Sequence, residues 1–300
     1  MKLLPIILAT AVSVAGMTAA QAETSRMDKI KSTGELTLGY RDSSIPFSYL
    51  DDNQKPVGYS MDICYGIADA LKKDLNLPNL KIKLVSVTSS TRIPLVANGT
   101  VDLACGSATN NEQRQVQVSF APTTFVTATR FAALKSSKLN DLADFKGKTV
   151  VSTSGTSNLK WLTQTNADDK LGMRIIPAKD HSEAFLTVAS GRASAFFMDD
   201  ILLAGLVANS QNAGDWMISK KAYTIEPYGI IEPKGDTQFK ALVDEVLAGL
   251  YRSGEIHAIY RRWFESPLPS QGLNLKLPMS AAFRRFIANP TDSPDPERYR

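Results

Sequence analysis

The sequence predicts an α/β fold made of two units, and three observations support this prediction. Short segments rich in β-branched residues alternate with amphipathic segments of ten or more residues, which is typical of strands and helices around mainly parallel sheets. The composition is 43% hydrophobic and 21% charged, which supplies enough apolar side chains for large cores. The length of 300 residues exceeds the roughly 100 to 200 residues of an ordinary domain, so we expect two compact units.

The first part of the chain alternates between predicted strands and helices. Glu35 to Tyr40 is β-prone and leads directly into the turn-rich residues 41–44. Ser60 is predicted to cap the helix that follows and that runs to Asn76. The next elements are a strand at 80–84, a helix at 88–98 and a strand at 101–105.

The second part repeats this alternation. We expect strands at 149–153, 173–178, 194–198 and 222–231, and helices at 158–166, 180–191, 201–209 and, divided at Gly254, within 238–264. Six prolines after Ser266 indicate a tail with one short helix at 279–287 and a loose end. Because ligands of such sheets bind beyond the carboxyl ends of the strands, the loops that follow the strands are expected to form one composite site.

The amino terminus indicates export. Lys2 precedes an apolar run from Leu3 to Met17, which is shorter than the roughly twenty residues of a membrane-spanning helix. Ala20 and Ala22 then fit a signal-peptidase site, so residues 1–22 are predicted to be a cleavable signal peptide. The alternative is an anchor helix that stays in place. Cleavage would place the mature chain outside the cytoplasmic membrane, in a bacterial periplasm.

The composition excludes several classes of protein. A net charge of +4, from 34 basic and 30 acidic side chains, is too mild to argue for nucleic-acid binding. Two His and two Cys leave little material for a metal site, and we expect neither metal nor cofactor. The Gly-x-Ser-x-Gly, Walker, His-Glu-x-x-His and Gly-x-Gly-x-x-Gly patterns are all missing from the sequence. The chain therefore shows no enzyme signature.

The two cysteines permit two interpretations. Cys64 falls on a predicted helix and Cys105 at the end of a predicted strand, so the sequence does not give their separation. Both could be buried free thiols, which are common in cores. In an oxidising compartment they could instead form one disulfide, worth about 2 to 4 kcal/mol.

Several polar residues follow predicted strands and are candidates for ligand contacts. Three are guanidinium groups that can bind a carboxylate, although most Arg in proteins are solvated or structural: Arg41, Arg92 and Arg114. Arg92 lies one turn after Ser89, at the amino end of a predicted helix. Two hydroxyl-rich loops, 106–109 and 154–157, are either binding loops or ordinary turns, and their candidates are Ser107, Thr109, Thr156 and Ser157.

An acidic pair and one histidine complete the set. Either Asp199 or Asp200 is expected to cap the next helix, and the other would be a buried carboxylate that a ligand ammonium could neutralise. His181 follows a strand and begins a helix in the expected cleft, although a single His is more often structural. Groups that match a carboxylate and an ammonium, without a nucleophile and base, are typical of a receptor for a zwitterion.

Three stretches carry a resemblance to a known family: residues 41–49 (RDSSIPFSY), 57–62 (VGYSMD) and 98–107 (NGTVDLACGS). They resemble the family 3 extracellular solute-binding proteins of polar amino-acid ABC transporters, and within them the periplasmic glutamate/aspartate-binding proteins. Residues 141–147, 179–181, 197–200 and 263–264 agree, so the resemblance covers about residues 27–275.

The resemblance implies a two-lobe periplasmic binding protein of type II-like architecture, with mainly parallel-sheet lobes joined by two hinge strands. Lobe 1 would comprise residues 27–127 plus 224–270, lobe 2 residues 128–223, and a Pro-rich tail residues 271–300. A monomer that serves an inner-membrane ABC permease is expected.

The resemblance also implies a role for each candidate residue. The α-carboxylate of the ligand would be held by Arg92, with help from Thr109, Arg114, Thr156 and Ser157, and the ammonium by Asp199 and Ser107. A side-chain carboxylate would be held by Arg41, Ser89 and His181, which favours L-glutamate or L-aspartate as the ligand.

Two other functions remain open at this point. The fold is also seen in cyclohexadienyl dehydratase-like enzymes, which need a general acid, and we expect no second carboxylate beside Asp199 to serve as one. A receptor that feeds a sensor instead of a permease is the other alternative.

Overall fold

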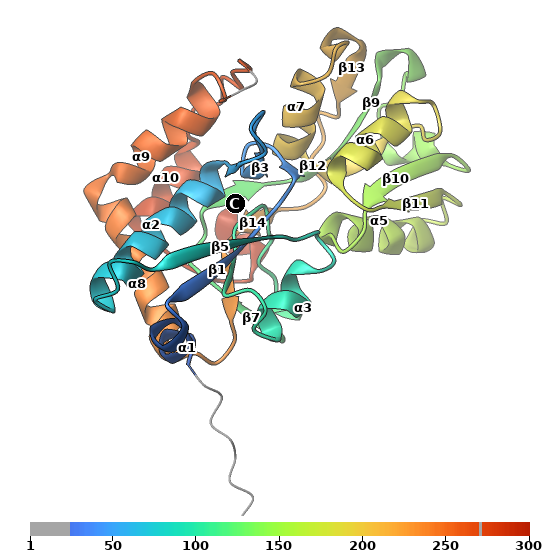
Figure 1. The fold of residues 1–300 in the computed structure, drawn as a ribbon. Helices are drawn as coiled ribbons and strands as arrows, with labels where there is room; N and C mark the ends of the chain where they lie inside the picture. Colours follow the sequence, from blue (N-terminus) through green and yellow to red (C-terminus); the bar gives the residue numbers. More distant parts are fainter. Residues whose placement is uncertain (1–24, 270–271) are drawn as a thin grey trace, which may run out of the picture.

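The computed structural model describes residues 25–269 and 272–300, so the predicted signal peptide lies outside the described residues. Figure 1 shows two lobes. One combines blue-to-teal segments from the start of the chain with orange and red segments from its end, and the other is green to yellow. No helix within 25–269 and 272–300 is long and apolar enough to cross a bilayer.

The first lobe, called lobe 1 below, contains a five-stranded sheet in the order β5-β1-β6-β15-β7. The bounds are β1 (Glu35–Tyr40), β5 (Lys81–Ser86), β6 (Leu103–Ala104), β7 (Val118–Phe120) and β15 (Ile231–Pro233). Strand β1 pairs in parallel with β5 and β6, whereas β15 is antiparallel to β6 and β7. The helices of this lobe are α1 (Arg26–Thr33), α2 (Tyr59–Asp74), α3 (Arg92–Ala97), α4 (Glu112–Gln115), α8 (Thr237–Ser253) and α9 (Glu255–Tyr260).

Two long helices of lobe 1 pack through matched apolar faces. In α2, Ile63, Ile67 and Leu71 recur every fourth residue and are fully buried, so they form one face of the helix. Val243 and Leu247 form the corresponding face of α8, which contacts α2. Replacing a fully buried residue such as Ile67 by Ala would cost about 2 to 5 kcal/mol.

The second lobe, called lobe 2, contains a sheet in the order β11-β10-β12-β9-β13. The bounds are β9 (Thr129–Leu134), β10 (Thr149–Thr153), β11 (Arg174–Ala178), β12 (Phe196–Asp199) and β13 (Trp216–Ile218). Strand β10 is parallel to β11 and β12, and β9 is antiparallel to β12 and β13. The α-helices are α5 (Ser157–Asp168), α6 (His181–Ala189) and α7 (Asp200–Ala208). Each sheet therefore has four strands in one direction and one reversed strand.

Two short strands connect the lobes. β8 (Phe125–Thr127) and β14 (Glu226–Tyr228) pair antiparallel, with Phe125 opposite Tyr228. β8 continues into β9 and β14 continues into β15, so each connecting strand enters the reversed strand of one sheet. Phe47 contacts the rings of both Phe125 and Tyr228, with centroids 5.1 Å apart in each pair. This aromatic contact fixes the base of the connection in lobe 1.

The structure resolves the two interpretations of the cysteines. Cys64 on α2 and Cys105 after β6 form a disulfide with a Cα–Cα separation of 6.3 Å. The bridge fastens α2 to the chain just before the loop that contains Ser107.

Three predicted elements differ in detail. Gly58, not Ser60, occupies the cap of α2, and the Ser60 hydroxyl donates to the carbonyl of Gly106 instead. The helix expected at 88–98 begins only at Arg92, because Thr88 and Thr91 bond to each other in a turn. The strand expected at 222–231 divides into β14 and the start of β15, since the chain passes there from the hinge into lobe 1.

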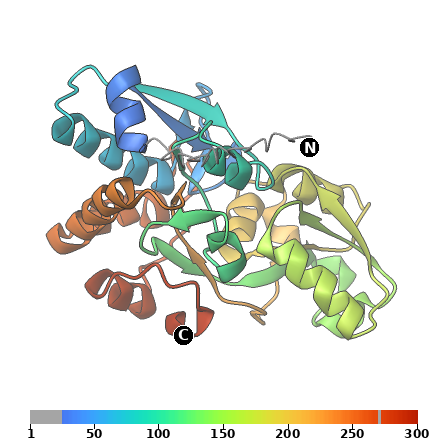
Figure 2. The ribbon, with the colours of Figure 1, turned by 90° about the horizontal axis from the view of Figure 1, so that it is seen from below.

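The expectation of a loose carboxyl end is wrong. α10 (Ala281–Ala288) is followed by a 3₁₀ turn, and Tyr299 is buried at 3% exposure. Its hydroxyl lies 2.8 Å from Thr123 Oγ1 and donates to the carbonyl of Ser293. Figure 2 shows the end of the chain folded back against lobe 1. The tail is held because its aromatic and hydroxyl groups find buried partners.

Candidate functional site

The predicted site residues meet where the two lobes face each other. Lobe 1 supplies residues that follow β1, β5 and β6, and lobe 2 supplies residues that follow β10 and β11 and end β12. All are buried except the half-buried Ser157: Arg41, Ser89, Arg92, Ser107, Thr109, Arg114, Thr156, His181 and Asp199. The carboxyl ends of both sheets thus form one cleft, as expected for this topology.

Direct contacts cross this cleft. Arg114 Nη2 donates to the carbonyl of Gly155 at 3.1 Å, and Ser157 Oγ lies 3.2 Å from Thr109 Oγ1. Gly155 lies so close to Ser90 that an added Cβ would be 2.6 Å from the Ser90 Cα, and its φ of +76° also favours glycine. The lobes are therefore in a closed arrangement.

Four buried polar atoms in the cleft have no hydrogen-bond partner among the described residues. They are Arg41 Nη1, Ser89 Oγ, Arg92 Nε and Ser107 Oγ. Arg92 uses Nη1 to donate to the Ser107 carbonyl at 2.8 Å, which fixes its orientation. Gly106 allows the stem of Arg41 to pack on the backbone, because a Cβ there would be 2.9 Å from Arg41 Cγ. Ser89, Arg92 and Ser107 line one enclosed space together with His181 and Asp199. Because unpaired buried polar atoms are costly, this space is a place for a polar ligand.

The three guanidinium groups also affect one another. Burial lowers the pKa of Arg41 to about 10. Burial, followed by the positive charges of Arg114 and Arg41, lowers the pKa of Arg92 well below its usual range. A bound anion would relieve this repulsion.

His181 is held as a neutral imidazole. Burial, then Arg41 and Arg92, lower its pKa well below the usual range. Nδ1 lies 2.8 Å from Thr153 Oγ1, and Nε2 lies 3.5 Å from Arg41 Nη2. If Thr153 donates to Nδ1, the proton on Nε2 is available beside Arg41.

Asp199 ends β12 and is held by two donors. Asn158 Nδ2 donates to Oδ1 at 2.7 Å, and the Tyr228 hydroxyl donates to Oδ2. Burial and then the charge of Glu226 raise the pKa of Asp199 to about 7. The expected side-chain cap of α7 is not made by Asp199 or Asp200. Asp200 instead accepts from Thr127 and pairs with Arg130 at 3.0 Å.

The expectation that no second carboxylate lies beside Asp199 is wrong. Glu226 on β14 is buried at 4% exposure and accepts from Ser157 at 2.7 Å and from Thr224 at 2.6 Å. Sequence reasoning missed it because the segment reads as an ordinary strand. The sequence does contain one indication. Alternate residues of a strand lie on the same face, so Glu226 and Tyr228, which are two residues apart, share one face.

One predicted hydroxyl is already used within lobe 2. Thr156 caps α5, where its Oγ1 accepts from Leu159 N at 3.1 Å and donates to the Thr153 carbonyl at 2.6 Å. Because its one proton is used in this way, the Thr156 hydroxyl cannot also donate to a ligand carboxylate. Ser157, the first residue of the helix, keeps its hydroxyl in the cleft.

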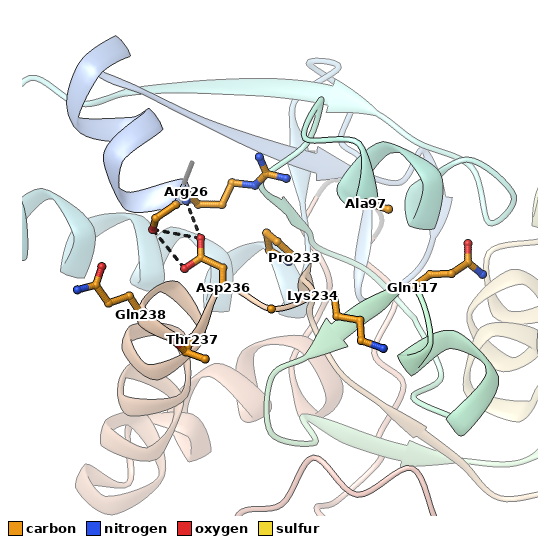
Figure 3. A pocket seen from close by; sticks show the side chains of 10 residues that line it. Arg26, Ala97, Gln117, Pro233, Lys234, Asp236, Thr237 and Gln238 are labelled. Atoms are coloured by element: carbon orange, nitrogen blue, oxygen red, sulfur yellow. Dashed lines mark hydrogen bonds between the residues drawn. The ribbon is translucent and has the colours of Figure 1, made fainter. Parts of the chain in front are cut away.

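A cavity of about 420 Å³ in lobe 1 differs from the cleft in how its charged groups are paired (Figure 3). Asp236 caps α8 and also accepts from the backbone N–H of Arg26 at 2.6 Å. Lys234 Nζ donates to the carbonyls of Gln115 and Val116. Arg26 Nε has no hydrogen bond, but it lies 3.7 Å from the buried carboxylate of Asp102, and Nη2 donates to the Val96 carbonyl. Because the protein itself pairs these charges, we assign this cavity a structural role.

A more apolar cavity of about 620 Å³ lies against β8 and is lined by residues such as Phe125, Ile201, Leu275 and Phe283. Its cation Arg130 is paired with Asp200, and Nη1 donates to the Ser219 carbonyl at 2.7 Å. A third opening of about 810 Å³ is lined by Arg114, Ser157 and Glu226 and forms the mouth of the cleft. The cleft is therefore the site where unpaired charge and access coincide.

Proteins of known function are similar to this chain over nearly its whole length. The L-glutamate/L-aspartate-binding protein of Pseudomonas aeruginosa is 48% identical over 296 residues, which cover 97% of this chain and 98% of the relative. The glutamate/aspartate import solute-binding protein of Escherichia coli is 45% identical over 274 residues, 91% of each chain.

Solved structures have the same architecture. A mutant of the arginine-binding protein ArgBP from T. maritima superposes with a TM-score of 0.72 at 27% identity, covering 80% of this chain and 99% of that chain. Residues 36–266 match the family described as bacterial extracellular solute-binding proteins, family 3. Together with the two-lobe fold and its cleft, this match shows that the chain belongs to the bacterial extracellular solute-binding proteins of family 3.

Proposed function

We propose that this protein is a non-catalytic receptor that binds L-glutamate or L-aspartate between its lobes and delivers it to an inner-membrane ABC permease. The observation that carries the proposal is the set of four unpaired buried atoms on Arg41, Ser89, Arg92 and Ser107. The atoms of Arg41, Ser89 and Arg92 are donors that a carboxylate can satisfy, and the Ser107 hydroxyl can accept from an ammonium. Each charge-assisted bond contributes about 1.5 to 3 kcal/mol. The names of the two relatives point to the same ligands.

The charges of the cleft support a ligand with two carboxylates and one ammonium. Arg92 with Arg114 would hold the α-carboxylate, and Arg41 would hold the side-chain carboxylate with Ser89 and His181. Asp199 would hold the ammonium. Neutral His181 is suited to donate to a carboxylate without adding charge.

Binding would couple to motion of the lobes about β8 and β14. We take lobe 1 as residues 27–127 plus 224–270 and lobe 2 as residues 128–223. The contacts of Arg114 with Gly155 and of Ser157 with Thr109 join residues on either side of these boundaries. A ligand that bridges the two lobes would favour the closed arrangement.

Export to the periplasm completes the proposal. Residues 1–22 would be removed as a signal peptide, and the mature chain would act there as a monomer. The Cys64–Cys105 disulfide agrees with an oxidising compartment. Genes for permease subunits beside this gene, and loss of glutamate uptake on its deletion, would distinguish a transport receptor from a sensor.

Calorimetry tests the ligand assignment. Purified residues 23–300, freed of bound ligand by unfolding and refolding, are titrated with each of the twenty amino acids. Heat is expected with L-glutamate or L-aspartate and much weaker or no heat with neutral and basic amino acids. No heat with either acidic amino acid would overturn the proposal, and turnover of arogenate or prephenate would establish the enzymatic alternative.

A further inference from the structure

Glu226 is a buried acid that forms no salt bridge within 4.0 Å among the described residues. The cation on which it acts is Arg114: burial lowers the pKa of Arg114, and the negative charge of Glu226 offsets part of that lowering. The oxygens of Glu226 accept hydrogen bonds from the hydroxyls of Ser157 and Thr224, and Thr129 Oγ1 lies 3.4 Å away. Neutral donors offset only part of the cost of burying a carboxylate. The third cavity gives Glu226 access to the mouth of the cleft. A carboxylate buried in this way lowers the stability of the ligand-free protein, and its position at the cleft indicates a role in ligand binding.

Glu226 and Asp199 belong to one hydrogen-bonded network. Asn158 Nδ2 donates to Asp199 Oδ1 and to Thr129 Oγ1, each at 2.7 Å, and Thr129 is the neighbour of Glu226. Tyr228, on the same strand as Glu226, donates to the other oxygen of Asp199. Two carboxylates connected in this way repel each other, and a single cation placed near them stabilises both.

The net charge of the cleft can be compared with the net charge of the ligand. Five buried groups in the cleft carry charge: three guanidinium groups, from Arg41, Arg92 and Arg114, and two carboxylates, from Asp199 and Glu226. With His181 neutral and both carboxylates ionised, as they would be beside a bound ammonium, these charges sum to +1. Glutamate, with two carboxylates and one ammonium, carries −1 and neutralises the cleft. Without Glu226 the sum would be +2, which would match a dicarboxylate that lacks an amino group.

We propose that Glu226 is a specificity-determining residue that makes binding depend on the ammonium of the ligand, so that the cleft rejects dicarboxylates without an amino group. This inference rests on the proposed function. Asp199 would contact the ligand ammonium directly. Glu226 would supply a second negative charge near that ammonium. It also orients the Ser157 hydroxyl between hinge and cleft.

The test compares L-glutamate with glutarate, which has the same two carboxylates and no ammonium. Calorimetry is performed with the wild type and with Glu226→Gln, which keeps the shape and removes the charge. Glutamate affinity is expected to fall about tenfold and glutarate affinity to rise about tenfold, which corresponds to about 1.4 kcal/mol for each ligand. The preference for glutamate would thus fall about a hundredfold.

Two variants serve as controls. Ser157→Ala removes the hydroxyl that Glu226 accepts from but leaves both carboxylates, so it is expected to weaken glutamate and glutarate by equal factors. Glu232→Gln neutralises a buried carboxylate outside the cleft, one that pairs with Lys240 at 3.0 Å, and is expected to leave the glutamate-to-glutarate ratio unchanged.

The outcomes are separable. Equal loss of both ligands in Glu226→Gln would overturn the proposal and reduce Glu226 to a residue that positions Ser157. Failure of the wild type to bind glutamate or aspartate would overturn the proposed function itself.

Proton exchange in the wild type tests the inference even if Glu226→Gln does not fold. Titrations at pH 7 in buffers of different ionisation enthalpy give the protons released or taken up on binding. The groups that face Asp199 are Glu226 and Tyr228 from β14, Asp200 from α7, and Arg92 and Arg114 from lobe 1. Glutamate is expected to release protons and glutarate to take them up. The same sign for both ligands would overturn the proposal.

Discussion

The two sides of the cleft differ in charge and in how they are held. Lobe 1 supplies all three buried guanidinium groups, whereas lobe 2 and β14 supply the buried carboxylates Asp199 and Glu226. Lobe 1 also contains the disulfide, whose Cys105 is two residues from Ser107, and the anchored tail. The difference indicates that the two lobes have different roles. Lobe 1 holds a fixed cationic surface that favours any carboxylate, with Glu226 on its connecting strand, and closure brings Asp199 of lobe 2 against that surface to select an amino acid.

The largest expected effect comes from removing the anionic contact. Asp199→Asn is expected to weaken every amino acid by a few hundredfold, because the ligand ammonium would lose its buried counter-charge. Calorimetry measures this loss. Thermal melting of the ligand-free variant should show no loss of stability, since the substitution removes repulsion with Glu226; a folded variant with unchanged affinity would contradict the assignment.

Removing the disulfide tests the rigidity of the cationic side. Replacing both Cys64 and Cys105 by Ser is expected to lower the free energy of unfolding by about 2 to 4 kcal/mol. Hydrogen exchange should increase in lobe 1 around α2 and β6 and stay unchanged in lobe 2. The wild type treated with a reductant is the matched control; equal destabilisation of both lobes would contradict the comparison.

Arg41 tests selectivity within the cationic side. Arg41→Met keeps an apolar stem that can lie over Gly106 but removes the guanidinium. The affinity for glutamate is expected to fall about 30-fold, equivalent to about 2 kcal/mol, while that for glutamine changes much less. Calorimetry with both ligands gives the ratio. An unchanged ratio would mean that Arg41 does not contact the side-chain carboxylate.

The pH dependence tests the charge of the anionic side. Asp199 has a pKa raised to about 7, and only its ionised form can pair with an ammonium. Glutamate affinity is therefore expected to fall as the pH drops below 7, by about 25-fold between pH 7.5 and 5.5. The charged and titratable groups that surround Asp199 are Glu226, Tyr228, Asp200, Arg92 and Arg114. The Asp199→Asn variant should lose most of this dependence. A wild-type affinity independent of pH in this range would contradict the assignment.

The smallest expected effect concerns the tail. Tyr299→Phe removes the hydroxyl that contacts Thr123 and Ser293, and is expected to cost about 1 kcal/mol of stability. Chemical denaturation measures this value. The exposed neighbour Arg298→Ala is the control and should have little effect; equal effects of the two variants would mean that the Tyr299 contacts do not hold the tail.

Much of the site could be predicted because strand ends in an α/β fold determine which loops meet. Arg41 and Asp199 were found in this way, since each lies at or just after the end of a β-rich segment. Glu226 was not found, because its place beside Asp199 depends on the pairing of β14 with β8, a contact between residues about a hundred positions apart. The anchoring of Tyr299 was missed for the same reason: its partner Thr123 is 176 residues away in sequence.

The route of the chain between the sheets has a consequence for how the protein can fold as it is made. Every strand of the lobe 2 sheet lies between residues 129 and 218, so that sheet can be complete once residue 218 has emerged. The lobe 1 sheet cannot, because β15, at Ile231–Pro233, is the strand that joins β6 to β7. Lobe 2, which begins later in the chain, can therefore complete its sheet first. The sheet of lobe 1, which begins earlier, stays incomplete between β6 and β7 until β15 has been made.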